Sequence, residues 1–249
     1  MNKQEYRQFY DQVGALNGWD FSRMKVVSER IQWDLYQEVT RVCRKSDLLL
    51  DIGTGGGEAL LAIADAVLLA IGIDCSSSMM KTAENNLRQV GKSNVRFHQM
   101  DAERLVFPDR LFNIVSCRHS GFHAQEVARV LADDGIFFTQ QVSERDKSNL
   151  KQAFGRGQSW GITHGTLQHR YIQELRDAGL KDIQVYEYDA TDYYESVQDL
   201  LFLLKHTPII PNFGEDERDY MLLHQFVEEH QCDRGIRTNS ERFMIVARK

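Results

Sequence analysis

The chain has 249 residues, of which 42% are hydrophobic, and a formal net charge of −6. This size and apolar content predict one large domain with a real core, and the negative charge disfavours a polyanionic partner such as nucleic acid. The four cysteines form no C-x-x-C pair and the eight histidines show no H-E-x-x-H spacing, so we expect no metal site. Residues 1–8 are polar and lack the apolar core of a signal peptide, which favours a cytoplasmic location.

The chain begins with a region rich in aromatic residues, 3–42, which has two helical stretches separated by the break at Asn17–Ser22. We expect Trp33 and Tyr36 to pack these helices against the rest of the fold. For Tyr10 and Trp19, close to the break, packing and a role at a ligand site are equally good interpretations.

The segment that follows, residues 48–64, is the most informative part of the chain. The apolar run Leu48–Leu50 predicts a buried strand that ends in Asp51 and a glycine-rich turn, and Ala59–Ala64 favours a helix. Such a turn lets a ligand approach bare backbone at a helix N-terminus. Glu58 stands where a dinucleotide fingerprint needs a small residue, and the Gly-Lys-Ser/Thr of a Walker loop is missing. An acid at the strand end suits a ligand with an ammonium group, which points to S-adenosylmethionine.

Three further strands follow at regular spacing. The run between Glu58 and Asp74 is interrupted by Asp65 and is shorter than the roughly 20 residues of a membrane span. Its last part, Leu68–Asp74, predicts a strand whose terminal acid lies where a ribose would be bound. A helix over Met79–Val90, with an N-cap in Ser76–Ser78 and closed by Gly91, leads to a strand at 94–100. The last of the three, Phe112–His119, precedes a helix at Ala124–Leu131 and a strand at Gly135–Val142.

With these segments in order, residues 45–142 resemble the class I S-adenosylmethionine-dependent methyltransferases, in particular the small-molecule group that includes ubiquinone-biosynthesis enzymes. The stretch Arg129–Gly135 is similar to the family's R-x-L-x-P-G-G turn, with the proline missing, and Asn113 replaces a usual Asp. The resemblance implies an α/β, doubly wound, mostly parallel seven-stranded sheet with an antiparallel last strand. It also implies a single domain, with an N-terminal helical lid over 1–45, a cofactor core over 46–142 and a substrate-side half over 143–249.

The resemblance further implies that S-adenosylmethionine is the cofactor and S-adenosylhomocysteine the product. The ribose would be held by Asp74, the adenine amino group by Asp101, and the adenine ring would meet the N–H of Ala102. The full set of expected cofactor-binding residues is Asp51, Gly53, Thr54, Gly55, Gly57, Asp74, Cys75, Asp101, Ala102 and Arg118. An N-terminal cover closes over the cofactor in such enzymes, so Tyr10 and Trp19 become lid candidates here.

In the second half, we interpret Ser143–Gln168 as mostly loop. Its glycine-rich stretch Phe154–Gly161 fits a mobile loop beside an active site and equally an ordinary surface connection. The predicted elements beyond it are helices at Leu167–Ala178, Val197–Lys205 and Glu217–His230 and strands at Ile183–Tyr188 and Phe243–Ala247. The last two helices form an insertion at about 196–232 that we expect to cover the substrate.

The sequence says less about how the methyl acceptor is bound. His119 and His123 flank the end of the fourth strand, where His119 could act as a general base or only orient the substrate. Arg118 could pair with an acidic substrate or with the cofactor carboxylate. We expect methyl transfer to a small molecule by a monomer or homodimer. An N-P-P-Y-type sequence is missing, which disfavours a nucleic-acid substrate. An RNA or protein methyltransferase, a nucleotide-dependent oxidoreductase and a non-catalytic cofactor-binding module stay open as alternatives.

Overall fold

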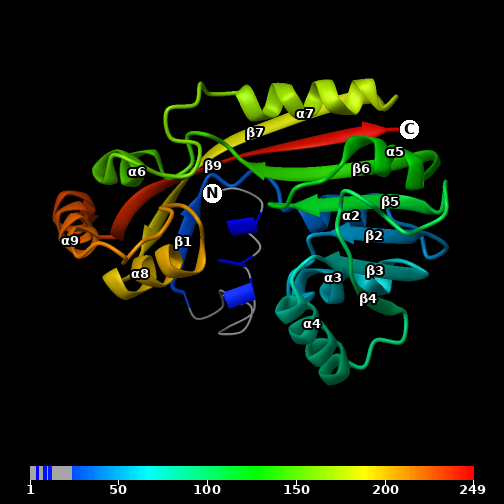
Figure 1. The fold of residues 1–249 in the computed structure, drawn as a ribbon, viewed down its shortest axis with the longest axis horizontal. Coiled ribbons are helices and arrows are strands. Elements are labelled where there is room, and N and C mark those ends of the chain that lie inside the picture. Colours follow the sequence, from blue (N-terminus) through cyan, green and yellow to red (C-terminus); the bar gives the residue numbers. More distant parts are fainter. Residues whose placement is uncertain (1–3, 6–7, 10, 13–23) are drawn as a thin grey trace.

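The computed structural model describes residues 4–5, 8–9, 11–12 and 24–249. Most of the described chain forms one mixed sheet with helices on both faces (Figure 1). The strands are β1 (Val26–Glu29), β2 (Leu48–Ile52), β3 (Leu69–Asp74), β4 (Val95–Gln99), β5 (Phe112–Arg118), β6 (Leu131–Val142), β7 (Lys181–Tyr194), β8 (Gln231–Cys232) and β9 (Gly235–Arg248). The α-helices are α2 (Leu35–Val42), α3 (Glu58–Ile63), α4 (Ser77–Val90), α5 (Ala124–Val130), α6 (Ser148–Phe154), α7 (Thr166–Asp177), α8 (Val197–His206) and α9 (Arg218–His230), and Ala64–Ala66 adds a 3₁₀ turn.

The strand order is β1-β7-β9-β6-β5-β2-β3-β4, with β8 paired to β9. Strands β2 to β6 pair in parallel, and β9 is antiparallel to both of its large neighbours, β6 and β7. The seven strands from β7 to β4 confirm the expected doubly wound sheet with an antiparallel last strand. Two short strands, β1 and β8, extend it.

Two hydrophobic layers cover the faces of the sheet. One packs α5 and α7 against Val115, Phe137 and Ile245, and the other packs α2 and α3 against Leu49 and neighbouring strands. Local signals explain where helices begin and end: Ser76 accepts a hydrogen bond from the N–H of Met79 at the start of α4, and Gly91 closes it in the left-handed region with φ +70°.

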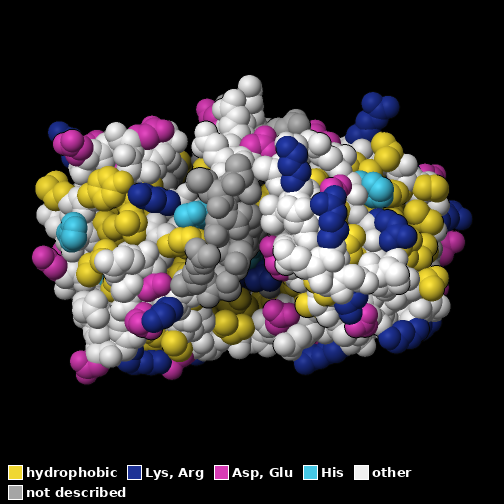
Figure 2. Space-filling model, turned by 90° about the horizontal axis from the view of Figure 1, so that it is seen from below, with side chains coloured by type: hydrophobic (Ala, Val, Ile, Leu, Met, Phe, Trp, Pro, Cys, Tyr) yellow, Lys and Arg dark blue, Asp and Glu magenta, His cyan; other side chains and the backbone are white. Residues whose placement is uncertain are grey.

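A third hydrophobic cluster lies at the far end of the molecule, beyond the parallel strands. It joins α6, α8 and α9 to the distal ends of β7 and β9 through residues such as Leu150, Leu200, Phe226 and Ile236. Figure 2 shows this end from below, with hydrophobic side chains gathered on its surface at the left.

Several expected boundaries were wrong. The stretch 143–168, interpreted as loop, contains helix α6. The strands predicted at Ile183–Tyr188 and Phe243–Ala247 extend to 14 residues each, because β7 and β9 pair along nearly their whole lengths. Within the expected helical cover of residues 1–45, Val26–Glu29 is a strand that pairs with β7. Within the described part of the chain, no helix has the length and apolar character needed to span a membrane.

Candidate functional site

The glycine turn lies between β2 and α3 and is tied to β3. The backbone N–H groups of Gly53 and Thr54 donate to the carbonyl of Ile73, at 2.9 and 3.0 Å. Gly53, Gly55 and Gly57 all have positive φ, which favours glycine. A Cβ at Gly53 would also lie 2.2 Å from the Cβ of Ser120, so the loop after β5 closes directly on the turn. Positive φ and close neighbours therefore both require glycine in this turn.

Asp51 sits at the end of β2 and is 1% exposed. Its Oδ1 accepts a hydrogen bond from the Ser116 hydroxyl at 2.7 Å, and the Tyr36 hydroxyl lies 3.3 Å from both carboxylate oxygens. Burial raises the pKa of Asp51 to about 6 although these hydrogen bonds oppose the shift. A carboxylate can accept about four hydrogen bonds, so a cationic ligand group can still be accommodated.

Thr54 supplies a further sign of a ligand next to Asp51. Its Oγ1 is buried and has no hydrogen-bond partner among the described residues. Buried hydroxyls are rarely left unpaired, and one in a glycine turn is a place where a bound molecule completes the hydrogen bonding. The residues of the turn therefore fit a polar ligand such as the aminoacyl end of S-adenosylmethionine.

Asp74 ends β3 and faces the same turn. One of its carboxylate oxygens accepts from the N–H of Gly55 at 3.1 Å, and the other from the N–H of Ser76 at 2.9 Å. Burial raises the pKa of Asp74, and these hydrogen bonds oppose it. Asp74 thus holds the glycine turn and the start of α4 together.

Asp11, in the described part of the N-terminal segment, lies beside the start of α4. Asp11 accepts hydrogen bonds from the hydroxyls of Ser76 and Ser78, through its carboxylate and its carbonyl respectively, at 2.7 and 2.9 Å. The lid candidates Tyr10 and Trp19 lie outside the described residues.

The third predicted acid is brought close by β4, because the N–H of Met100 donates to the carbonyl of Asp74 at 3.0 Å. Asp101 is exposed and accepts from the N–H of Glu103, while Ala102 and Cys75 are half-buried. The acids at or just after three strand ends therefore lie along one edge of the sheet.

The end of β5 carries Arg118 and His119. The Arg118 guanidinium lies 5.8 Å from the centre of the Tyr36 ring and forms no ion pair within the described residues. His119 has a positive φ of 54° and is linked to Gln140 of β6. By contrast, His123 is exposed at the N-cap of α5, and its charge acts on Glu126 of that helix. The structure thus separates the two predicted histidines.

Sequence reasoning missed several polar contacts at this place. Ser116 is a lone hydroxyl in an apolar strand, which could have marked it. Trp33 and Tyr36 do pack as expected, but their polar ends also reach Gln140 and Asp51. No local pattern distinguishes Gln140. The part of the chain that the structure describes contains no group of three or more His, Cys, Asp or Glu side chains arranged to hold a metal ion.

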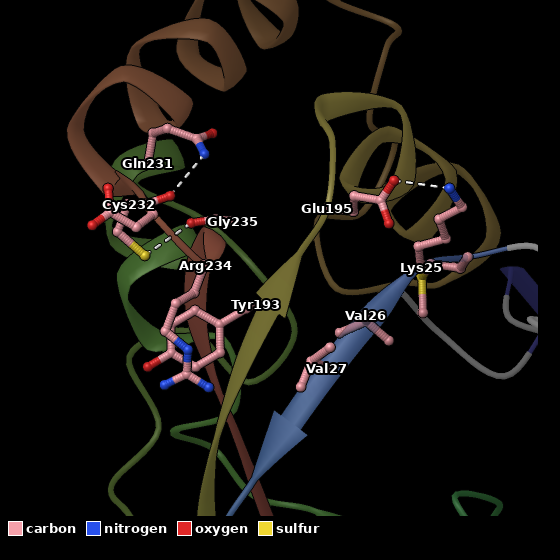
Figure 3. A pocket seen from close by; sticks show the side chains of 11 residues that line it. Lys25, Val26, Val27, Tyr193, Glu195, Gln231, Cys232, Arg234 and Gly235 are labelled. Atoms are coloured by element: carbon pink, nitrogen blue, oxygen red, sulfur yellow. Dashed lines mark hydrogen bonds and ion pairs between the residues drawn. The ribbon is translucent and has the colours of Figure 1, made fainter.

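A groove of about 440 Å³ lies away from this edge, between β1 and the turn that joins β8 to β9 (Figure 3). Its two cations are already paired, Lys25 with Glu195 and Arg234 with Glu29. The Arg234 guanidinium also lies 4.0 Å from the centre of the Tyr193 ring. Among the described residues, the buried side-chain atoms without a hydrogen-bond partner belong to Thr54 and Glu241, and neither residue lines this groove.

The sheet order and the antiparallel β9 are those of the class I methyltransferase fold. Residues 49–135 match the family described as a methyltransferase domain. An uncharacterized methyltransferase YcgJ of Bacillus subtilis is 41% identical over 105 residues, which cover 39% of this chain and 42% of that protein. The ubiquinone/menaquinone biosynthesis C-methyltransferase UbiE of Pseudomonas paraeruginosa is 31% identical over 125 residues, 45% of this chain and 48% of that one.

The crystal structure of YcgJ superposes with a TM-score of 0.63 at 22% identity, covering 86% of this chain and 97% of that one, which shows a shared fold. The chain thus matches the methyltransferase-domain family over residues 49–135 and shares the fold of YcgJ. It spans less than half the length of the two curated relatives described above.

Proposed function

We propose that the chain transfers the methyl group of S-adenosylmethionine to a small-molecule acceptor by in-line displacement. The observation that carries this proposal is the buried Thr54 hydroxyl, which has no hydrogen-bond partner among the described residues and lies in a glycine turn beside Asp51. The family match and the UbiE relative support the methyl transfer and the small acceptor, respectively.

Different residues would bind different parts of the cofactor. Asp51 would accept from the ammonium group and Thr54 would bind the aminoacyl end. Asp74 would accept the ribose hydroxyls with its remaining lone pairs, next to Cys75, and Asp101 and Ala102 would bind the adenine. When bound, S-adenosylmethionine supplies a methyl group on a positively charged sulfur, and this sulfur is the activated leaving group. The protein's task is to orient the acceptor and to exclude water.

Cofactor binding can be tested by calorimetry with S-adenosylmethionine, S-adenosylhomocysteine and NAD. We expect both adenosyl compounds to bind and NAD not to bind comparably. Asp74→Ala should weaken binding by about 1.5–3 kcal/mol, because it removes a charged hydrogen-bond acceptor. Asp65→Ala is a matched control, since Asp65 is an exposed acid of the same half, paired with Lys92. Preference for NAD, or equal effects of both variants, would contradict the proposal.

The acceptor class can be tested with methyl-labelled S-adenosylmethionine and separated cell fractions. Label should enter the small-metabolite fraction. Label found only in RNA or protein would overturn the small-molecule assignment while leaving methyl transfer intact.

A further inference from the structure

Three side chains from separate parts of the chain form a hydrogen-bonded series beside the cofactor edge. The indole Nε1 of Trp33, just before α2, lies 3.1 Å from Oε1 of Gln140 on β6. The Nε2 of Gln140 lies 3.0 Å from Nε2 of His119, which directly follows β5. We call these residues the Trp33–Gln140–His119 relay.

The donors and acceptors in this relay can be assigned from chemistry alone. An indole N–H can only donate, so the oxygen of the Gln140 amide must face Trp33. The amide nitrogen therefore faces His119, and an amide NH₂ can only donate. It follows that Nε2 of His119 accepts and carries no proton. A neutral imidazole of this kind has its single proton on Nδ1.

The surroundings of His119 agree with a neutral ring. Burial lowers its pKa well below 6.5, and the charges of Arg242 and Arg118 lower it further. The backbone N–H of His119 donates to the carbonyl of Gln140 at 2.8 Å, which holds the ring in place despite its left-handed φ. Nδ1 forms no hydrogen bond to the described residues, so its N–H is available to a ligand.

The neighbouring groups are donors as well. Tyr188 of β7, whose ring centre lies 4.5 Å from that of Trp33, has a pKa raised mainly by burial and therefore keeps its proton. Arg242 is paired with Asp146 at 2.5 Å, whereas Arg118 has no such partner in the described chain. The same positive charges that disfavour an imidazolium at His119 favour a negative charge on a ligand beside it.

We propose that His119 contacts the methyl acceptor as a neutral Nδ1–H donor, and that with Arg118 it selects an acceptor bearing an anionic oxygen. That the ligand is the methyl acceptor rests on the proposed function, whereas the protonation state of His119 does not. In this arrangement His119 takes no proton during the reaction, because Nε2 is occupied and Nδ1 is already protonated. A role as general base, one of the two expectations for this residue, is then excluded.

The state of His119 can be read by NMR on protein labelled with ¹⁵N in its histidines. Long-range ¹H–¹⁵N spectra should show a single tautomer with the proton on Nδ1. Gln140→Glu replaces the donor with an acceptor, so the imidazole should gain a proton on Nε2 and its pKa should rise. Trp33→Phe keeps the ring but removes the N–H that orients the amide, and should give a mixture of tautomers.

Gln140→Glu retains the size of the side chain and Trp33→Phe leaves a smaller aromatic ring, so circular dichroism checks that both variants fold. A wild-type spectrum with the proton on Nε2, or a relay variant that folds but leaves the tautomer unchanged, would overturn the assignment. This measurement needs neither cofactor nor acceptor, so it stands or falls separately from the proposed function.

Selection for an anion can be tested with benzoate and benzamide, which have nearly the same shape but differ in charge. Added to protein saturated with S-adenosylhomocysteine, benzoate should shift the His119 resonances and bind about tenfold more tightly than benzamide, as expected for one charge-assisted contact. Arg118→Gln should remove this preference, and Arg88→Gln, on the exposed side of α4, should keep it.

Equal binding of the two probes, or no response to either, would overturn the anionic-oxygen assignment. If S-adenosylhomocysteine itself fails to bind, it is the proposed function that fails. The two failures are thus distinguishable in one titration series.

Discussion

Residues 46–142, where we propose that the cofactor binds, and residues 143–249, proposed to form the substrate side, are built on different principles; we call them the cofactor half and the substrate half. In the first, strands β2 to β5 are five to seven residues long, and the acids that line the site stand at or just after strand ends, close in sequence to the glycine turn. In the second, β7 and β9 are 14 residues each and depend on one another from Lys181 to Tyr194. Strand-end motifs therefore mark the proposed cofactor site, whereas the pairing of two long strands builds the proposed acceptor side. The family match, residues 49–135, lies within the first half.

Buried ion pairs make the substrate half sensitive to single charge removals. Lys147 is 2% exposed in its side chain, and its Nζ lies 2.5 Å from Oδ2 of Asp192. Asp192→Ala would leave this ammonium buried without its partner, so we expect the free energy of unfolding to fall by about 3–5 kcal/mol. Urea denaturation measures the change.

The control for this variant is Glu195→Ala, which breaks an ion pair with Lys25 whose side chains are more than half exposed. It should change stability by about 0–1 kcal/mol. Replacing both buried partners, as in Lys147→Met with Asp192→Leu, should recover much of the loss. A small loss for Asp192→Ala would mean that buried charge does not hold this half together.

In the cofactor half, the strongest test is a glycine comparison. Gly53 and Gly91 have nearly the same φ, +73° and +70°, but a Cβ at Gly53 meets Ser120 whereas one at Gly91 meets nothing within 4 Å. Alanine at either position strains the backbone by about 1–2 kcal/mol. Gly53→Ala should cost about 1–3 kcal/mol more because of the overlap.

Only Gly53→Ala should also abolish cofactor binding in calorimetry, since it alone fills the turn. Equal loss of stability in both variants, with cofactor affinity retained, would show that the loop after β5 can move away from the turn.

The smallest expected effect is a pH dependence from Asp51. Its pKa in the folded protein is raised to about 6, so folded Asp51 binds a proton more readily than unfolded Asp51. This residue alone therefore makes the cofactor-free protein more stable as pH falls from 7 towards 4. Cofactor affinity should instead fall as pH falls, because the ammonium group of the cofactor binds the ionised carboxylate of Asp51.

We expect S-adenosylmethionine affinity to be constant above about pH 7 and to fall up to tenfold per pH unit below about 6, or about 1.4 kcal/mol per unit. Calorimetry across this range measures it. Asp51→Asn should bind more weakly and without this dependence; a wild-type affinity that is flat down to pH 5 would mean that the ammonium group is not held by Asp51.

The comparison of the halves also explains what could be predicted from sequence. Runs that end in Asp51, Asp74 and Asp101 predicted three strands. These strands pair in parallel, so their ends lie at one edge of the sheet. The polar stretches Asp189–Tyr194 and Gly235–Arg242 carry no alternating apolar pattern, so the outer parts of β7 and β9 were missed.

Those outer parts are held instead by each other and by groups far away in sequence. Asp192 is fixed by Lys147 and by Ser28 of β1, and Asn239 by Arg145 and Asp189. Likewise, the relay depends on Trp33, His119 and Gln140 meeting across three elements, which no spacing rule reveals. The residues proposed to bind the cofactor could be named from their motif, whereas Gln140, proposed to set the His119 tautomer, could not.

The position of β9 between β6 and β7 has a consequence for how the protein is made. During synthesis, β6 and β7 leave the ribosome well before Gly235–Arg248, and until that strand arrives each of them has an open hydrogen-bonding edge. Open edges of this kind are templates for wrong pairing, and closing them requires a contact between distant parts of the chain, which is slow. The nascent chain should therefore be most prone to aggregation after α7 has emerged and before β9 has, and a chaperone would be of most use in that interval.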